Sequence, residues 1–579
     1  MTTFRASFSI QFWLTAAAAG LLVACSGSGN HAPPGGNASG GASGSGGQSG
    51  GPGGGSGGAT VDGSGGSSTG GASGNSGTGG STAGSGGAPA PYDGGLPDVS
   101  GGGGTGAIGK RSAAGFFHPG VVVTQGGLND VRNRIAMGDP DLKKALAALV
   151  QDINDATLPA CPSEDTAGRC HLPAAPSAPA AHVMVTCGSH SAAPAGDTSC
   201  DDEKADALAA YSHALLWYLT QDEAEAQKAI LFLDAWNNVT AHVGYMDSDN
   251  SPLQAGWTGT LWARAAELIR YTYAQPQYAK GWSDAQAVAF GKMLTTAIRP
   301  YVNVDITNSP DIQNGNWEAS EADAFLQISV YNDSMADYQQ AAKNALSAMK
   351  YYVYLTSDGA TPMAGNDVVV CKKNGKKTSG CGVDYWWGIA TAAGLADGTS
   401  QETCRDLEHV QYGLGAFANA AETAAIQGIA GVDLYGDTTV KFGERLFATF
   451  EFHAAILKGR SNFSGSGATN PDVGLIPAPS RGYTCDGLNN FTMQETTSAV
   501  AMIAAVDFGS TRRSNYPVQP TWEIAFNHFV NVEKRAMPNT KALLEASGTF
   551  KGNRPTFASH PLAWETLTKL QTGKIGFPQ

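Results

Sequence analysis

Apolar residues recur three and four positions apart along most of the chain after about residue 115. This spacing places them on one face of a helix, where they can be buried. The pattern predicts helices over Leu128–Ile135, Leu142–Ile153, Lys204–Tyr218, Glu223–Asn237, Gly259–Tyr273, Ser283–Ala297, Glu318–Tyr331, Met335–Tyr354, Arg405–Gln427, Thr438–Lys458, Thr521–Phe529 and Leu562–Lys569. Alternating strand patterns are scarce, and we predict one short strand, Asp367–Cys371, followed by a lysine-rich loop, Lys372–Lys377.

Many helices of similar length, joined by long loops, predict an all-α fold of antiparallel helical hairpins with little β structure. Periodicity alone does not decide between a ring of hairpins and a bundle. Ser283 before Asp284, and Gly436-Asp437 before Thr438, are predicted helix caps. The long loops 161–201, 359–402 and 459–490 are expected to carry function, because compact domains rarely keep such loops otherwise.

The N-terminal segment has the pattern of an export signal. Arg5 precedes an apolar run from Phe8 to Ala24, and small residues stand just before Cys25, as in a bacterial lipobox. We therefore predict a lipoprotein signal peptide over residues 1–25 with a lipid on Cys25. The protein would then be exported and membrane-anchored, in the periplasm or at the cell surface. The alternative is an ordinary signal peptide in which Cys25 is incidental.

Residues 26–110 are mostly Gly, Ser, Ala and Thr, and 36 of the 76 glycines fall there. Such a segment cannot bury enough apolar surface to fold, so we predict a flexible linker followed by one folded domain over residues 111–579. This domain has 34 Lys and Arg against 47 Asp and Glu, a formal net charge of −13. The charge argues against nucleic acid as a partner, and mildly against any polyanion.

Eight cysteines follow Cys25, an even number that suggests disulfides in an exported protein. Short spacings favour the pairs Cys161–Cys170, Cys187–Cys200 and Cys371–Cys381, which leaves Cys404–Cys485, although other pairings stay open. No C-x-x-C or H-E-x-x-H spacing occurs, so no metal or cofactor is expected.

The most specific candidate site is the sequence around Arg405, His409 and Tyr412. Their offsets of zero, four and seven place a guanidinium, an imidazole and a phenol on one helix face. Gly413 and Gly415 follow and leave room for a close approach of backbone or ligand. The alternative is a helix whose polar face meets solvent.

A second candidate is the segment Gln313–Glu318, in which an Asn-Gly turn opens a helix. The amide of Asn316 and the free N–H groups of the helix can converge there on an anion. The alternative is plain capping, with Asn316 as the cap and Glu318 in the first turn. Weaker candidates lie near aromatic residues, and they are Gln254, Trp257, Asn527, His528 and Arg554, whereas His453 is expected to be a core residue.

Several short motifs together resemble the alginate-lyase-like family of polysaccharide lyases, whose members form α/α toroids. In chain order they are Phe117–Gly120, Leu253–Trp257, Arg264–Glu267, Asn314–Glu318, Gln401–Asp406, Trp522–Ala525 and Ala563–Glu565. The resemblance covers most of residues 117–564 and implies an (α/α) toroid. It also implies β-elimination on a uronate polymer, alginate (polymannuronate) or polyglucuronate, which leaves a 4,5-unsaturated uronate end.

The resemblance implies a role for particular residues. Asn316 would neutralise the substrate carboxylate, and Arg405 and Tyr412, seven residues apart, would serve catalysis. Family members carry a histidine immediately after the asparagine, but this chain has Trp317. Either His409 takes over that role or Tyr412 acts alone. The absence of a histidine after Asn316 favours substrates whose C5 proton and O4 lie on one ring face. We expect substrate contacts from Glu318, Gln254, Trp257, Trp317, Asn527, His528 and Arg554, and a monomeric enzyme.

Two other functions fit parts of the pattern. A glycoside hydrolase on a similar toroid would need two facing carboxylates, for which Glu318 with Asp406 or Glu523 can be nominated. A surface-tethered glycan-binding protein with a decayed active site would explain Trp317. The retained spacing of Arg405 and Tyr412 weighs against that binding protein.

Overall fold

The computed structural model describes residues 96–97, 99, 109–163, 169–177, 183–187, 196–244, 251–303, 315–359, 371–373, 376–378, 396–403, 407–461, 518–545, 558–559 and 562–575. The chain divides into Met1–Gly84 and Ser85–Gln579, and every element below belongs to the second unit. The predicted signal peptide and Cys25 lie outside the described residues.

Helices dominate the described residues. They are α1 (Gln125–Ala136), α2 (Pro140–Asn154), α3 (Ser199–Thr220), α4 (Glu223–Ala235), α5 (Ser251–Thr272), α6 (Asp284–Met293), α7 (Arg299–Val302), α8 (Asn316–Tyr331), α9 (Met335–Tyr352), α11 (Leu407–Gln427), α12 (Phe442–Ser461), α14 (Trp522–Phe526), α15 (Pro538–Glu545) and α16 (Glu565–Lys569). Helical turns η2 (Leu294–Ile298), η3 (Thr356–Asp358) and η5 (Asn527–Val532) extend some of them.

The strands are short and pair two by two. The antiparallel pairs are β1 (Lys110–Arg111) with β2 (Phe117–His118), β5 (Cys371–Lys373) with β6 (Lys376–Thr378), and β7 (Ala558–Ser559) with β8 (Leu562–Ala563). The parallel pair is β3 (Met184–Cys187) with β4 (Ala241–Gly244). The predicted lysine-rich loop is therefore wrong in part, because Lys372, Lys373, Lys376 and Lys377 lie in β5 and β6.

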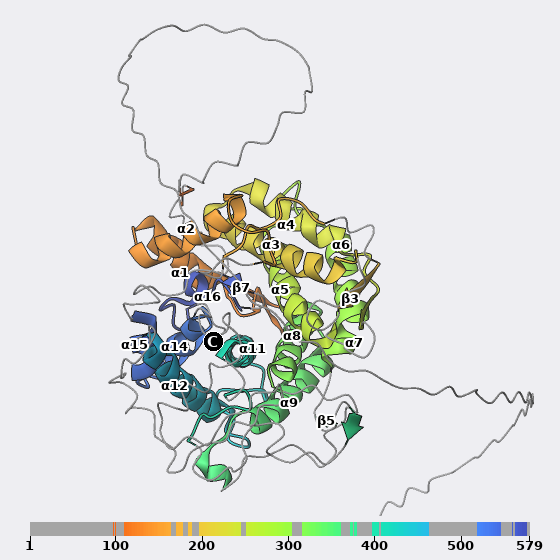
Figure 1. The fold of residues 1–579 in the computed structure, drawn as a ribbon. Coiled ribbons are helices and arrows are strands. Elements are labelled where there is room, and N and C mark those ends of the chain that lie inside the picture. The colour runs from red at the N-terminus through yellow and green to blue at the C-terminus, as the bar shows by residue number, and fades with distance from the viewer. Residues whose placement is uncertain are drawn as a thin grey trace, which may run out of the picture. The chain divides into compact units, whose positions relative to one another are not determined.

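The helices form a closed double ring. On the inside, α3 packs against α5, α5 against α8, α8 against α11, α11 against α14, α14 against α16, α16 against α1, and α1 against α3. Outside this ring α4 covers α3 and α5, α9 covers α8, α12 covers α11 and α14, and α2 covers α1 and α16 (Figure 1). The packing confirms the all-α toroid and decides for the ring over the bundle.

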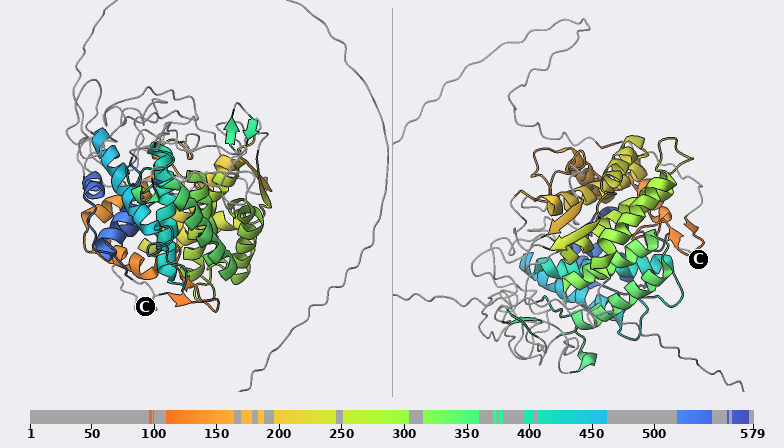
Figure 2. Two further views of the ribbon diagram at one scale, coloured as in Figure 1. Left: turned by 90° about the horizontal axis from the view of Figure 1, so that it is seen from below. Right: turned by 90° about the vertical axis from the view of Figure 1, so that its right-hand side faces the viewer.

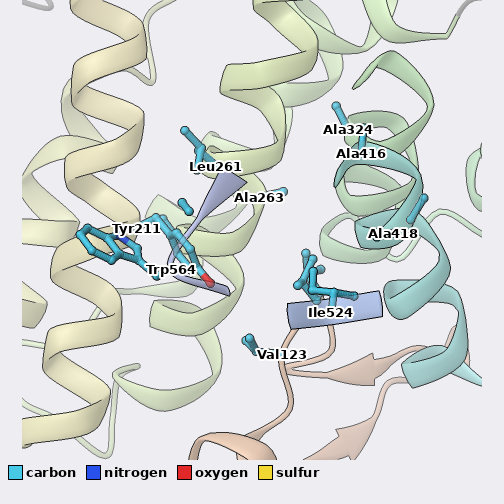
Figure 3. Close-up of a cluster of buried hydrophobic side chains, with 14 of the residues drawn as sticks. Val123, Tyr211, Leu261, Ala263, Ala324, Ala416, Ala418, Ile524 and Trp564 are labelled. Atoms are coloured by element: carbon cyan, nitrogen blue, oxygen red, sulfur yellow. The ribbon is translucent and has the colours of Figure 1, made fainter. Parts of the chain in front are cut away.

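Small residues let the inner helices approach closely. A Cβ added at Gly256 would lie 3.0 Å from the backbone carbon of Ser320 on α8, and one at Gly259 would lie 2.9 Å from Ile298 Cγ2. Figure 3 shows Tyr211, Leu261, Ala324, Ala416 and Ile524, contributed by five different inner helices, around one buried cluster. Small and large apolar side chains together fill this interior.

The interior also holds buried charges. Arg264 on α5 donates through Nε to Gln327 Oε1 at 3.2 Å, and its terminal nitrogens lie 3.8 Å from Asp323 and 3.5 Å from Glu565. Burial raises the pKa of Asp323 to about 7, although the charge of Arg264 opposes the shift. A buried charge needs such partners, because an unpaired one is costly in a medium of low dielectric constant.

The predicted helix boundaries hold best where a cap marks them. Ser283 caps α6 in a capping box with Gln286, as predicted. Helix α12 begins at Phe442 rather than Thr438, because Lys441 has a left-handed φ of 58° and Asp437 instead binds the backbone N–H of Val440. Helix α5 begins at Ser251, before the predicted Gly259, and Leu562–Ala563 is a strand that precedes α16.

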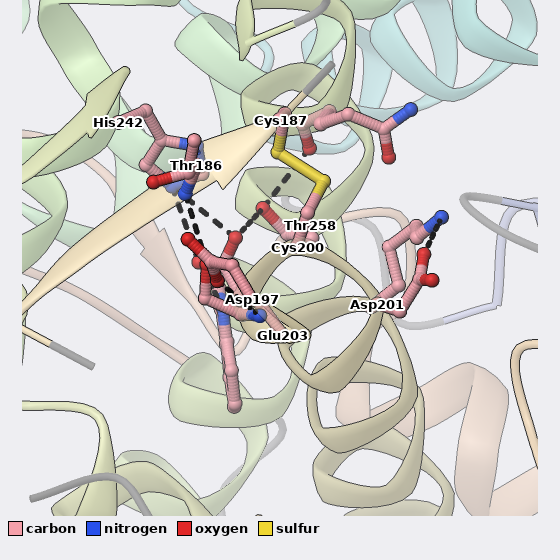
Figure 4. Close-up of a disulfide and its surroundings, with 12 residues drawn as sticks. Thr186, Cys187, Asp197, Cys200, Asp201, Glu203, His242 and Thr258 are labelled. Atoms are coloured by element: carbon pink, nitrogen blue, oxygen red, sulfur yellow. Dashed lines mark hydrogen bonds and ion pairs between the residues drawn. A yellow bond between two sulfur atoms is a disulfide. The ribbon is translucent and has the colours of Figure 1, made fainter. Parts of the chain in front are cut away.

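Two predicted disulfides are confirmed, Cys161–Cys170 and Cys187–Cys200. The second joins the end of β3 to the first turn of α3, beside the buried Glu203 (Figure 4). The predicted pairs Cys371–Cys381 and Cys404–Cys485 involve residues outside the described part of the chain. Among the described residues, no helix has the length and apolarity needed to cross a membrane.

Candidate functional site

The N-terminal turns of α5, α8 and α11 meet at one end of the ring. Trp257 on α5 donates through Nε1 to Ser320 Oγ on α8 at 3.2 Å, and its ring lies 5.1 Å from that of Tyr412 on α11. Because these contacts join early residues of three neighbouring helices, the helices run parallel and present their N-termini to the same end. This end lies on the side of β5 and β6 and away from β1 and β2 (Figure 2).

An aromatic cluster surrounds Tyr412. Leu253, Trp257, Tyr412 and Leu562 are buried together, and the half-buried Trp317 packs against them. The ring of His409, half-buried one turn earlier on α11, lies 6.1 Å from that of Tyr412 and nearly perpendicular to it. The structure thus brings together four of the predicted site residues, Trp257, Trp317, His409 and Tyr412, and leaves Tyr412 only 1% exposed.

Asn316 is held by a carboxylate that sequence reasoning did not single out. Its backbone N–H donates to Glu402 Oε2 at 3.0 Å, and its side-chain Nδ2 donates to Glu402 Oε1 at 2.6 Å. Tyr352, the last residue of α9, donates its hydroxyl to Glu402 Oε2 at 2.8 Å. These bonds fix the amide of Asn316, because a flipped amide would set its oxygen against the carboxylate.

This orientation decides what Asn316 offers a ligand. Asn316 Oδ1 is buried and has no hydrogen-bond partner among the described residues. Of the two Nδ2 hydrogens one is used by Glu402, so one further donor hydrogen remains. The alternative of plain capping by Asn316 is wrong, because Gly315 occupies the cap position and Asn316 is the first residue of α8, whereas Glu318 does lie in the first turn.

Two glycines make this arrangement fit. Gly315 has a φ of 70°, and a Cβ there would lie 3.0 Å from Glu402 Cδ. A Cβ at Gly413 would lie 2.3 Å from the hydroxyl oxygen of Tyr352. The room that Gly413 was predicted to leave is therefore occupied by Tyr352, the second partner of Glu402.

The turn that carries Glu402 is held in place by a contact with helix α12. Thr403 Oγ1 lies 3.0 Å from Nε2 of His453, which is fully buried on α12. Burial lowers the pKa of His453 to about 4, so this imidazole is neutral at physiological pH. His453 is a core residue, as expected, and it supports the position of Glu402 from outside the site.

Further acidic side chains lie in the first turns of α8. Glu318 is buried and has polar or electrostatic partners. Glu321 is fully buried, and neither carboxyl oxygen has a hydrogen-bond partner among the described residues. Burial, reinforced by the charge of Glu318, raises the pKa of Glu321 well above its ordinary value. An uncompensated buried charge is costly, so these surroundings favour the neutral form of the Glu321 carboxyl group.

Gln254, one turn before Trp257, is buried on α5, and its Oε1 has no hydrogen-bond partner in the described part of the chain. It adds an acceptor at the end of the ring where Trp257 lies. No group of three or more His, Cys, Asp or Glu side chains among the described residues is arranged to hold a metal ion.

Asn527 and His528 lie elsewhere, in the turn η5 that follows α14. Asn527 Oδ1 accepts the backbone N–H of Gly573 at 2.8 Å, and His528 stacks on Tyr435 and lies 3.0 Å from Glu533. Among the described residues, both side chains contact these structural neighbours and not the aromatic cluster around Tyr412. Their substrate-binding role stays a prediction, as do those of Arg405 and Arg554, which lie outside the described residues.

Neither a family model nor a curated protein sequence matches the chain. Among solved structures, the chain is similar to alginate lyase A1-III from Sphingomonas species A1, at 17% identity and a TM-score of 0.34, over 59% of this chain and 79% of the other. A variant of alginate lyase A1-III complexed with a tetrasaccharide gives 16% identity and a TM-score of 0.35, with the same coverage. These values are too low to carry residue roles across, so the assignment of this site rests on its own geometry.

Proposed function

We propose that the protein is a polysaccharide lyase that cleaves a uronate-containing polymer by β-elimination. In this reaction a base removes the C5 proton of a uronate, the bond from C4 to the O4 leaving group breaks, and a 4,5 double bond forms. The substrate we favour is polymannuronate or polyglucuronate. The observation that carries the proposal is the meeting of Tyr412, His409 and Trp257 at the helix end where Glu402 orients Asn316.

The reaction needs positive or hydrogen-bonding groups at the substrate carboxylate, because negative charge accumulates there when the C5 proton leaves. The remaining Nδ2 hydrogen of Asn316 suits this task, and its direction is set before the substrate arrives. The N-termini of α5, α8 and α11 add partial positive charge at the same end of the ring. Arg405, four residues before His409 in the sequence, would supply a full positive charge.

Tyr412 is the residue we assign as base and acid. A phenol titrates near pH 10 in water, so it needs nearby positive charge to act as a phenolate. Arg405, seven residues before Tyr412 in the sequence, would supply that charge, and the ring of His409 lies 6.1 Å from the phenol ring. Where the C5 proton and O4 lie on one ring face, as we expect for mannuronate and glucuronate, Tyr412 can take the first and protonate the second.

A glycan-binding protein is the second candidate, and one observation favours it. Trp317 packs against the cluster of Trp257 and Tyr412, so two indoles lie beside one phenol, a surface suited to stacking on sugar rings. Tyr412 would then be a packing residue. The two functions differ in what the hydroxyl of Tyr412 does, because a binding protein needs its ring and a lyase needs its oxygen.

The test is ultraviolet absorbance over time on polymannuronate, polyguluronate, polyglucuronate and a glycosaminoglycan. The unsaturated product absorbs and a hydrolase product does not. We expect rising absorbance on polymannuronate or polyglucuronate and a loss of about 10³-fold in Tyr412→Phe, as general acid–base catalysis suggests. Tyr338→Phe is the matched control, because the hydroxyl of Tyr338 is buried without a hydrogen-bond partner among the described residues. Binding without turnover on every polymer, unchanged in Tyr412→Phe, would decide for the glycan-binding protein.

A further inference from the structure

A cavity lies at the opposite end of the ring from Tyr412. It has a volume of about 520 Å³ and is lined by the last turns of α3 and α5, the first turns of α1, and strands β1 and β2. Because α5 begins near Trp257 and ends at Thr272 beside this cavity, the helix separates the two places by its full length. The volume is within the range of small-molecule sites and suits a ligand the size of a disaccharide.

The lining is cationic although the chain is acidic. Lys110, Arg132 and Arg270 line the cavity, and no Asp or Glu is among its described lining residues. Arg270 stands in the last turn of α5, where a cation also complements the helix dipole. That explanation does not extend to Lys110 on β1 or to Arg132, which lies in the middle of α1. The charge of this cavity therefore exceeds what helix ends require.

The remaining lining is suited to sugar hydroxyl groups. Side-chain amides of Gln125, Asn129, Gln221 and Gln277 and the phenols of Tyr218, Tyr271 and Tyr278 line it. Several of these groups are held in place: the Tyr218 hydroxyl donates to Asn129 Oδ1 at 2.9 Å, and Tyr271 stacks on His118 with 4.2 Å between ring centroids. A preorganised wall of this kind lowers the ordering cost of binding a polar ligand.

His118 adds to the same electrostatic setting. Burial lowers its pKa, but the charge and hydrogen bond of Glu267, with those of Asp333, outweigh burial and raise the pKa above the ordinary value. The imidazole lies 2.7 Å from Glu267 and 3.1 Å from Asp333. His118 therefore offsets part of the charge of these two carboxylates, which also attract Arg270 from behind the cavity wall.

From this lining we infer a second binding site, separate from the Tyr412 site, for a short acidic saccharide whose carboxylate meets Arg132, Arg270 and Lys110. The inference does not depend on the lyase proposal, because it uses none of the residues of the Tyr412 site. An uncharged sugar would keep the amide and phenol contacts but lose the ion pairs, so charge is the property that separates ligands from non-ligands here.

The experiment is hydrogen exchange of the full chain with dimannuronate, and with mannobiose as the uncharged probe. We expect dimannuronate to slow exchange in residues 217–221 and 270–278 and mannobiose to leave it unchanged. Gln277→Glu places a like charge in the cavity at an exposed position and should weaken the calorimetric affinity about tenfold. Gln339→Glu, equally exposed but on α9, is the matched control and should bind as the unmodified chain does.

Unchanged exchange in both segments with dimannuronate would overturn the inference, and so would equal protection by mannobiose or undiminished affinity in Gln277→Glu. The lyase assay separates this result from the proposed function. Gln277→Glu should keep the full rate of product formation. Protection of the two segments in a chain that forms no unsaturated product would sustain this site and refute the lyase. Product formation without such protection would support the lyase and overturn this second site.

Discussion

Glu402→Gln is the variant that most sharply tests how the candidate site works. Glu402 accepts two hydrogen bonds from Asn316 and one from Tyr352, and it is 5% exposed. Glutamine has the same shape but a single acceptor oxygen. If that oxygen keeps the bonds to Asn316 N and Tyr352, the glutamine NH₂ group faces Asn316 Nδ2. The amide of Asn316 must then turn over so that its oxygen accepts.

The magnitudes separate stability from activity. Hydrogen bonds to a charged group contribute about 1.5–3 kcal/mol and those between neutral groups about 0.5–1.5 kcal/mol. Glutamine is uncharged, so the cost of burying the carboxylate charge disappears and offsets part of this loss. We therefore expect Glu402→Gln to lower the free energy of unfolding by about 1–3 kcal/mol. Removal of one preorganised donor at a developing negative charge costs about 10²-fold in rate. We therefore expect a folded enzyme with kcat reduced about 10²-fold and KM changed much less.

The assays are urea denaturation and the absorbance of the unsaturated product. Glu451→Gln is the matched control, because Glu451 accepts the backbone N–H groups of Asn539 at 3.0 Å and Thr540 at 2.8 Å, away from the site. It should lose comparable stability and no activity. A Glu402→Gln enzyme with an undiminished kcat would refute the assignment of Glu402 as the residue that positions Asn316. An equal loss of activity in Glu451→Gln would show that the effect is general.

Three further predictions concern stability. In Gly413→Ala the added Cβ would lie 2.3 Å from the Tyr352 hydroxyl oxygen. The cost of overpacking should outweigh the gain in helix propensity, so we expect urea denaturation to show a free energy of unfolding lower by about 2 kcal/mol. Burial raises the pKa of Asp323 to about 7 against about 4 in the unfolded chain, so the folded state binds this proton more tightly. Stability should fall by up to about 4 kcal/mol as pH rises from 4 to 7, and a similar slope in Asp323→Asn would contradict this. Replacing Cys187 and Cys200 together by serine opens a loop with a sequence separation of 13 and should cost about 3 kcal/mol in thermal or urea unfolding, whereas an unchanged midpoint would speak against the loop-entropy account.

The helices could be predicted from the sequence because their signal is local. Apolar spacing located the core-facing part of nearly every long helix, and Ser283 marked the start of α6. The predicted helix boundaries are wrong where an irregular backbone conformation determines the start of a helix. The left-handed φ of Lys441 delays α12 until Phe442, and no pattern of apolar residues encodes that conformation. Closure into a ring also followed from packing between helices and not from their periodicity.

The candidate site could be predicted only in part. Tyr412 and His409 share a helix, so their spacing places them together whatever the fold. Glu402 meets Asn316 from 86 residues away, which no local pattern can show. The signal that was present is its place in the motif Gln401–Asp406, three residues before Arg405. Gly315 and Gly413 give a second signal only in retrospect, because the partners they make room for are set by the tertiary fold.

Charge at the two ends of the ring follows the direction of the inner helices. The N-termini of α5, α8 and α11 meet beside Asn316, and the carboxyl groups of Glu318, Glu321 and Glu402 lie at this positive end. The proposed uronate substrate is compatible with these carboxyl groups, because burial favours the neutral form of Glu321 and Glu402 accepts hydrogen bonds from Asn316 and Tyr352. At this end Glu402 orients Asn316, which we propose as the donor to the substrate carboxylate, so the net negative charge of the chain is no argument against a polyuronate substrate.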